Sequence, residues 1–168
     1  GSYQAEVANA KTEFFIAVGL FDEESQELEM KISLFVEWFI FSRPLSDNRQ
    51  KPIDLVLTGK LFPISSQEKP FYLSLQSHRH SLFEFLKVKD DDVHIRDLFS
   101  DYKLILKKSS VALGFSKQEI FETRLFPHED SFVFSRAFCI HPSEATSYIR
   151  KEIKKVKKLK EDDHFQAR

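Results

Sequence analysis

Basic residues near the C-terminus are the first feature whose type and spacing suggest a chemistry. Residues 150–160 contain seven cations and one acid, so this segment has a charge of +6 in a chain of net charge −1. A charge asymmetry of this size can attract a polyanion. We therefore predict a polyanion or partner surface formed by Arg150, Lys151, Lys154, Lys155, Lys157 and Lys158.

The same segment has a plainer interpretation as a structural helix. Ile149, Ile153, Val156 and Leu159 recur at helical spacing with Tyr148 beside them, so the helix can dock while its lysines remain in water. Lys is also a less specific phosphate ligand than Arg, and no aromatic residues that could stack on bases are interleaved here. Burial of the apolar residues would indicate a structural helix, and exposure a docking element.

His78 and His80 form the best candidate for a metal site. Two histidines separated by a single residue place their side chains on the same face only in an extended strand, and some zinc sites require such an arrangement. Further ligands would have to come from the acidic triplet at 90–92 or from His94, at no recognisable spacing. We favour the alternative, in which the histidines meet carbonyl groups at a helix end and the triplet forms a turn. No metal or cofactor is predicted.

Cys139 and the nearby His141 leave nucleophilic catalysis formally open. However, Cys139 lies in an apolar segment typical of a strand, where a free thiol behaves as a small hydrophobe. The sequence has no nucleophile elbow, HExxH motif, Walker loop, paired CxxC or dinucleotide-binding glycine pattern. Its four glycines are too few to build a loop that holds a phosphate. We therefore predict that the protein is not an enzyme.

Composition places the chain among ordinary globular domains. Of its 168 residues 42% are hydrophobic and 30% charged, and the one cysteine excludes a disulfide framework and fits a reducing, cytoplasmic location. No apolar run approaches the ~18 residues that a membrane span needs. Phenylalanine occurs 18 times, mostly at periodic positions, which favours a phenylalanine-rich core over an exposed aromatic surface.

Apolar spacing predicts that the first half of the chain is helical. Helices are expected over about residues 3–20, 23–41, 53–58 and 70–77. The second has two apolar stripes and should be central, and it ends at Arg43 because a residue before proline avoids helical angles. Ser65 and Glu68 have capping-box spacing, but Pro70 would then fall inside the helix, so we start that helix at Pro70.

After His80 the sequence changes to the alternation typical of strands. Strands are expected over residues 82–88, 93–95, 102–106, 120–126 and 132–138, with turns at 90–92 and 127–130. A closing helix is expected from about Pro142 to Lys160. Gly1 and Ser2 are typical of the remnant of a cleaved expression tag and carry no weight in the fold prediction.

Together these patterns predict one α+β domain over residues 1–168. An N-terminal helical layer (3–80) is expected to pack on a small antiparallel β-barrel of about five strands (81–140). An amphipathic helix (141–162) closes it. The charged end also suggests that the chain is a piece of a longer protein.

Several blocks of the sequence resemble a bacterial family. They are residues 10–15, 35–45, 77–86, 93–99, 120–127 and 138–142, which together span most of the chain. The resemblance is to uncharacterised bacterial proteins, some of which carry a separate cysteine-rich SEC-C metal motif. That motif is absent here, so zinc binding is not implied. The resemblance implies a bacterial cytoplasmic protein with helices before strands, and it supplies no activity or catalytic residues.

Three functions follow as hypotheses from these observations. The first is a non-catalytic interaction or regulatory module that binds another protein, because a well-specified core carries no catalytic constellation. The second is a nucleic-acid-binding protein that uses the basic C-terminal helix. The third is a metal-dependent hydrolase built around His78 and His80. No segment of the chain is expected to span a membrane.

Overall fold

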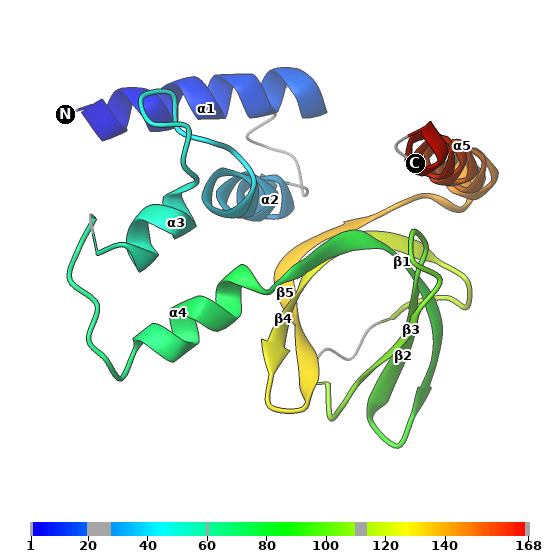
Figure 1. The fold of residues 1–168 in the computed structure, drawn as a ribbon. Helices are drawn as coiled ribbons and strands as arrows, with labels where there is room; N and C mark the ends of the chain where they lie inside the picture. The colour runs from blue at the N-terminus through cyan, green and yellow to red at the C-terminus, as the bar shows by residue number, and fades with distance from the viewer. Residues whose placement is uncertain (1, 20–27, 60, 110–113, 167–168) are drawn as a thin grey trace. The chain divides into compact units, whose positions relative to one another are not determined.

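The fold is given by a computed structural model that describes residues 2–19, 28–59, 61–109 and 114–166 (Figure 1). The chain divides into two compact units, residues 1–78 and 79–168. Helices make up the first unit, and five strands with a C-terminal helix make up the second. This confirms the predicted α+β class, and the unit boundary lies within two residues of the predicted change at His80.

The first unit contains four α-helices. They are α1 (Ser2–Val18), α2 (Leu28–Phe41), α3 (Pro52–Leu57) and α4 (Lys69–Gln76), each within a few residues of its predicted range where described. Residues 23–27, the predicted start of the second helix, lie outside the described part. Contacts of α2 with both α1 and α3 explain its two apolar stripes.

The start of α4 combines the two signals that seemed to conflict in the sequence. Ser65 and Glu68 do form the reciprocal bonds of a capping box, with the Glu68 backbone N donating to Ser65 Oγ at 3.2 Å. These bonds close a turn before the helix, and the helix itself begins at Lys69. Pro70 therefore falls in the first helical turn, where its missing N–H costs nothing.

Aromatic rings fill the space between α1 and α2. The Phe14 ring lies 5.7 Å from that of Phe35 and 5.4 Å from that of Trp38, measured between centroids. Ala10 of α1 is fully buried, and its small side chain is consistent with a close approach of the α1 and α2 backbones.

Arg43 holds α1 to the end of α2. Its side chain is 10% exposed, its Nε donates to Glu13 Oε2 at 2.8 Å, and an Nη donates to Glu6. The guanidinium also lies 5.9 Å from the Trp38 ring centroid, within reach of a cation–π contact. Glu6 in turn accepts from the backbone and hydroxyl of Ser46, both at 3.1 Å. One arginine thus connects both helices and the loop that follows.

The second unit is a single five-stranded antiparallel sheet in the order β3-β2-β1-β4-β5. Its strands are β1 (Arg79–Lys89), β2 (Asp92–Asp97), β3 (Lys103–Leu106), β4 (Ile120–His128) and β5 (Ser131–Ile140). The first half of β1 pairs with β4 and its second half with β2, with a register shift between Phe85 and Lys87. Because β3 also contacts β5, the sheet curls into a partly closed barrel (Figure 1).

The acidic triplet at residues 90–92 occupies the β1–β2 turn, as the sequence predicts. Asp90 and Asp91 have φ of 51° and 65°. Positive φ at both central residues is typical of the two-residue hairpin turns that match strand twist. Asp92 begins β2 and accepts a hydrogen bond from the Lys108 backbone N at 3.0 Å. These residues therefore have a structural role.

Phenylalanines fill the barrel, which confirms the predicted phenylalanine-rich core. Phe83, Phe85 and Phe121 are buried, with Phe115 and Phe138 packed against them. The rings of Phe115 and Phe121 stack with centroids 4.6 Å apart. Successive side chains of a strand point to opposite faces of the sheet. The residues that alternate with the buried ones in β1 and β2 therefore lie on the outer face of the barrel.

The C-terminal helix docks on that outer face through only part of its predicted apolar stripe. After the short 3₁₀ helix η1 (Ser143–Ala145), α5 (Thr146–Gln166) packs Ile149 and Ile153 against Leu82, Leu98 and Ile120. The two alternatives that the sequence left open are therefore both met in part, because the rest of the stripe stays outside this contact. Tyr148, Val156 and Leu159 are 66%, 38% and 63% exposed. Tyr148 and Leu159 lie well round the helix from Ile149 and Ile153, whereas Val156 lies on the same side as Ile149 but outside the contact.

The Arg43–Glu6 pair makes the stability of the first unit depend on pH. The hydrogen bond from Arg43 holds the pKa of the Glu6 carboxyl below its ordinary value of 4.5, against an opposing effect of burial. A carboxyl whose pKa is lowered by folding stabilises the fold above its unfolded pKa, and this stabilisation is lost as pH falls through the folded pKa. We expect Glu6→Gln to be about 1–3 kcal/mol less stable than the wild type at neutral pH.

This expectation can be tested by urea unfolding followed through the fluorescence of Trp38, the only tryptophan of the chain. The stability gap between wild type and Glu6→Gln should close as the pH is lowered from neutral to well below the ordinary glutamate pKa. The exposed Asp47 lies in the same unit, and Asp47→Asn serves as the control. A gap of equal size at both ends of the pH range would contradict this role of Glu6.

Candidate functional site

Three of the six predicted cations of α5 are held by acids. Arg150 donates to Glu84 at 2.8 Å, Lys155 to Glu152 at 2.6 Å and Lys157 to Asp101 at 2.5 Å. The hydrogen bond from Lys157 lowers the pKa of the Asp101 carboxyl below its ordinary value. Arg150 and Lys157 therefore fasten the helix to the barrel, and their charge is partly neutralised.

The other three predicted cations, Lys151, Lys154 and Lys158, are exposed and have no ion-pair partner within the described residues. Lys154 and Lys158 follow Arg150 at intervals of four residues. Side chains at this spacing lie along one side of a helix. Arg150 points toward the sheet at Glu84, and each step of four residues turns the row by ~40° away from the docked side, so Lys154 and Lys158 extend it toward solvent.

The outer face of β1, β2 and β3 carries further cations. Arg96 of β2 pairs with Glu84 of β1 on one side and with Lys103 of β3 on the other. In the next row, His94 lies between Lys87 and Ile105. Directly paired residues of an antiparallel sheet share a face, so these side chains form two neighbouring rows on the outside of the barrel.

Glu84 joins the sheet rows to the helix row. Its side chain is 5% exposed, and its carboxylate lies 2.8 Å from an Nη of Arg150 and 3.7 Å from an Nη of Arg96. Both arginine side chains are more than a third exposed, and each guanidinium has five N–H donors, more than its contact with Glu84 uses. A buried carboxylate thus fixes two arginines from different elements side by side.

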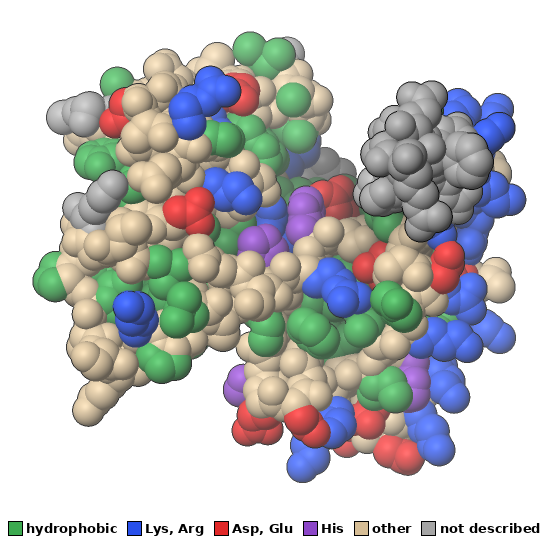
Figure 2. Space-filling model, viewed as in Figure 1, with side chains coloured by type: hydrophobic (Ala, Val, Ile, Leu, Met, Phe, Trp, Pro, Cys, Tyr) green, Lys and Arg blue, Asp and Glu red, His purple; other side chains and the backbone are tan. Residues whose placement is uncertain are grey.

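We call the resulting patch the basic surface. Figure 2 shows Lys and Arg side chains gathered along the right-hand edge of the view, from α5 down over the neighbouring strands. Six cations define the patch: Lys87, Arg96, Lys103, Arg150, Lys154 and Lys158.

Only the helix half of the basic surface follows from the sequence reasoning above. Lys87, Arg96 and Lys103 stand alone on three strands, and nothing in their spacing brings them together. Alternation indicates outward positions for Arg96 and Lys103, but it would place Lys87 on the face of Phe85. Only the register shift after Phe85 brings Lys87 opposite His94. Recognising the patch required the pairing register of the strands.

Apolar and aromatic groups lie beside these cations. Ile105 sits within the sheet rows and is 47% exposed. Tyr102, which precedes Lys103, is 67% exposed and follows Asp101, the residue that Lys157 holds. The basic surface therefore includes an apolar side chain, and the exposed Tyr102 ring lies at its edge, at the start of β3.

The histidines of the candidate metal site have other partners. The His78 Nδ1 lies 2.8 Å from the Leu75 carbonyl O at the end of α4, which is the favoured helix-end interpretation. His80 lies on β1, where its Nε2 is 2.8 Å from Glu122 Oε1. The hydrogen bond with His80 lowers the pKa of the Glu122 carboxyl despite its burial. Among the described residues no group of three or more His, Cys, Asp or Glu could hold a metal ion.

Cys139 and His141 lie where the strand pattern places them. Cys139 is half-buried on β5 opposite Glu122, and the backbone N of His141 donates to the Ile120 carbonyl O at 2.9 Å. His141 continues the pairing of the strand edge up to the turn that precedes α5. None of the helices in the described part of the chain has the length and apolar character needed to cross a membrane.

The Glu84–Arg150 pair makes a testable contribution to stability. Arg150→Met leaves the buried carboxylate without its hydrogen-bonded cation, so we expect a loss of about 1–3 kcal/mol in the free energy of unfolding. In Glu84→Met/Arg150→Met both charges are gone, and most of the loss should be recovered. Urea unfolding followed by circular dichroism measures both variants, and a single variant as stable as the wild type would refute this role.

Comparison with known proteins identifies a family and no relative of known activity. No curated protein matches the chain, and no solved structure matches it. One family model covers residues 7–168, which is nearly the whole sequence and includes both units. The chain therefore belongs to DUF7986, a family of unknown function.

Proposed function

We propose that this protein is a non-catalytic binding module whose ligand is single-stranded nucleic acid. The observation that carries the proposal is the basic surface, in which strands β1, β2 and β3 and helix α5 contribute cations to one outer face of the barrel.

The arrangement of its charges supports a polyanionic ligand. Arg150 begins the row that continues to Lys154 and Lys158, and it meets Arg96, the neighbour of Lys103, at Glu84. The cations of the helix and of the sheet therefore adjoin one another. Phosphate contacts of this kind release counterions and dominate the affinity for nucleic acids. Arg96 and Arg150 also keep exposed guanidinium donors, which match the geometry of phosphate oxygens.

The exposed ring of Tyr102 supports a single strand over a duplex. Binding of single strands combines a positively charged track with aromatic side chains on which unpaired bases stack. Tyr102 precedes Lys103 in the chain and lies exposed at the edge of the basic surface, while Ile105 adds apolar surface within the face itself. In a duplex the base faces are already stacked and are not available to such side chains.

The architecture of the barrel agrees with this proposal. A partly open five-stranded barrel is also the plan of OB folds, which bind oligonucleotides or oligosaccharides on the face of strands two and three. Here β1 pairs with both β2 and β4, β3 contacts β5, and β2 and β3 carry Arg96 and Lys103. Fold alone does not imply function, so the analogy adds to the charge pattern and does not replace it.

A specific observation also favours a second candidate, binding of another protein. Tyr148, Val156 and Leu159 lie exposed on α5, and exposed apolar side chains on a docked helix suit a protein contact. The interaction or regulatory role expected from the sequence thus remains a proposal, as do a bacterial origin and a cytoplasmic location. Binding that depends on these three side chains and not on the lysines would favour this second candidate.

Removing charge from the basic surface should weaken binding and reduce its salt dependence. For Lys103→Gln/Lys154→Gln we expect lower affinity for a labelled single-stranded oligonucleotide of any sequence. The slope of log affinity against log salt should fall by about 1.4, because each lost phosphate contact removes ~0.7. Fluorescence anisotropy at about 50 and 200 mM salt measures both quantities, since affinity changes steeply over that range.

The matched control for this experiment is Lys69→Gln/Lys117→Gln. It removes the same charge from exposed lysines that lie outside the basic surface. Equal weakening by both double variants would mean that overall charge, and not this surface, attracts the ligand. A wild-type protein that binds no oligonucleotide at low salt would overturn the proposed function.

Tyr102→Ala should weaken single-strand binding by about 5- to 150-fold, because loss of one stacked base costs ~1–3 kcal/mol. Tyr102→Phe should bind nearly as well as the wild type, since the ring is retained. Tyr148→Ala is the control, because Tyr148 is equally exposed, at 66% against 67%, but is not part of the basic surface. The prediction fails if a duplex of the same sequence shows the same dependence on Tyr102.

A further inference from the structure

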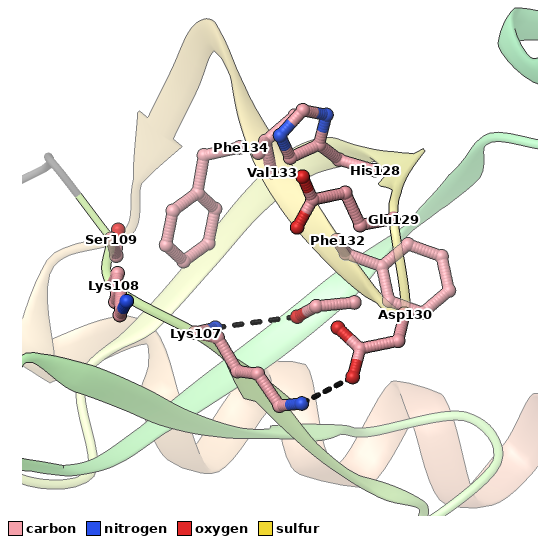
Figure 3. Close-up of a pocket in the computed structure, with 10 residues that line it drawn as sticks. Lys107, Lys108, Ser109, His128, Glu129, Asp130, Phe132, Val133 and Phe134 are labelled. Carbon is pink, nitrogen blue, oxygen red and sulfur yellow. Dashed lines mark hydrogen bonds and ion pairs between the residues drawn. The ribbon is translucent and has the colours of Figure 1, made fainter.

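A pocket opens at the seam of the barrel, where the end of β3 faces the β4–β5 hairpin (Figure 3). Its volume is about 360 Å³, which lies at the lower end of the range of small-molecule sites. The lining comes from two chain segments, residues 107–109 and 128–134. All of these residues belong to the second unit.

The walls of the pocket combine an aromatic ring with hydrogen-bonding groups. The half-buried Phe134 ring packs on Phe138 with centroids 5.2 Å apart, which fixes its position from behind. His128, Glu129 and Ser109 surround the same space (Figure 3). Most of the lining residues are therefore polar, with one side formed by Phe132, Val133 and Phe134, and this combination suits a small planar group that has hydrogen-bonding edges.

The rim is held in place by contacts across the seam. Ser131 Oγ donates to the Ile105 carbonyl O at 3.0 Å, and the Lys107 ammonium pairs with the Asp130 carboxylate. That hydrogen bond raises the pKa of Lys107 and lowers that of Asp130, so the pair is charged at neutral pH. The seam is therefore bridged by side chains, and the pocket is the space beside the bridge.

Two residues of the rim adopt backbone conformations that side chains disfavour. Lys108 has φ of 46° and Glu129 has φ of 51°, both in the left-handed region. Such conformations occur where surrounding structure imposes them, often at binding sites. The hydrogen bond from the Lys108 backbone N to Asp92 helps to hold one of them.

We infer that this pocket receives one unstacked nucleobase of the strand that lies on the basic surface. The inference rests on the proposed function and adds a site to it. β3 leads from Lys103 on the basic surface to Lys107 at the pocket, and four strand residues span ~13 Å. A strand that follows β3 would therefore reach the pocket within a few nucleotides.

The charges of the pocket favour a base over the other parts of a nucleotide. Lys107 neutralises Asp130 and Lys108 balances Glu129, so the rim has no excess of positive charge to attract a phosphate, whereas a neutral ring can stack on Phe134. The edge of a base has both donors and acceptors, and the rim offers both kinds, because Glu129 accepts, Lys108 donates and Ser109 can do either. A carboxylate is also a partner for the amino group of cytosine.

The test uses nucleosides, which have a base but no phosphate and so do not depend on the basic surface. Adenosine, cytidine and uridine are titrated at millimolar concentration into the full ¹⁵N-labelled chain, with ribose as the probe that lacks a base. We expect amide shifts at residues 107–109 and 128–134 with nucleosides and none with ribose. The same shifts should occur in Lys103→Gln/Lys154→Gln, because that variant leaves the pocket intact.

Glu129→Gln tests the polar edge without changing the fold of the core, since the side chain is exposed. The affinity for cytidine should fall several-fold, while that for uridine should change little, because uridine has no amino group for the carboxylate. Glu119→Gln, an acid outside the pocket lining, is the control and should leave both affinities unchanged.

The outcomes separate this inference from the proposed function. Oligonucleotide that binds the basic surface without shifting the pocket amides would overturn the inference and leave the proposed function intact. Equal shifts with ribose, or none with any nucleoside, would also overturn it. Nucleoside binding in a chain that binds no oligonucleotide would overturn both, because the pocket would then be a site for free nucleosides.

Discussion

The buried carboxylate of Glu84 is the constraint on which the rest of the second unit depends. A charged group that is 5% exposed is costly unless cations compensate it. The compensation comes from Arg96 on the neighbouring strand and from Arg150 on α5. The helix can satisfy Glu84 only by turning Arg150 toward the sheet. That orientation also sets the direction of the lysine row that follows Arg150 at intervals of four residues.

Hydrophobic packing and this ion pair act together to position α5. Ile149 and Ile153 dock on Leu82, Leu98 and Ile120 over the outer face of the sheet. Burial of two isoleucines gives the helix an attachment but does not define its rotation tightly, because the apolar contact is non-directional. Glu84 and Asp101 supply direction through Arg150 and Lys157, which lie seven residues apart along one side of the helix.

A small number of side-chain contacts also holds the barrel together, and the same is true of the first unit. Large aromatic side chains fill the barrel, and its closure at β3 and β5 relies on side-chain bridges in place of a complete ladder. The pocket is a consequence of that incomplete closure. In the first unit Arg43 connects α1, α2 and the following loop through two carboxylates. Its guanidinium thus holds together elements that a larger apolar core would otherwise hold.

Sequence alone determined the order of the elements, because each has a period that is local and long enough to detect. The helices of the first half, the change at His80, the turn at Asp90–Asp91 and the phenylalanine core were all predicted from alternation, helical spacing and turn residues. What the spacing left open was the burial of the apolar stripe of α5. Three of its members are exposed, since burial depends on the shape of the surface beneath the helix as well as on spacing.

Tertiary structure alone decided which charges lie together. The sequence indicated the lysines of α5, but it did not show that Arg150 and Lys157 form ion pairs with acidic residues of the barrel. Nor did it show that Lys87 and Lys103 join the same patch. Strand register and helix rotation set these neighbours, and both are fixed by contacts between residues far apart in the chain. Periodicity predicts which side of an element is apolar, whereas only packing determines what the polar side faces.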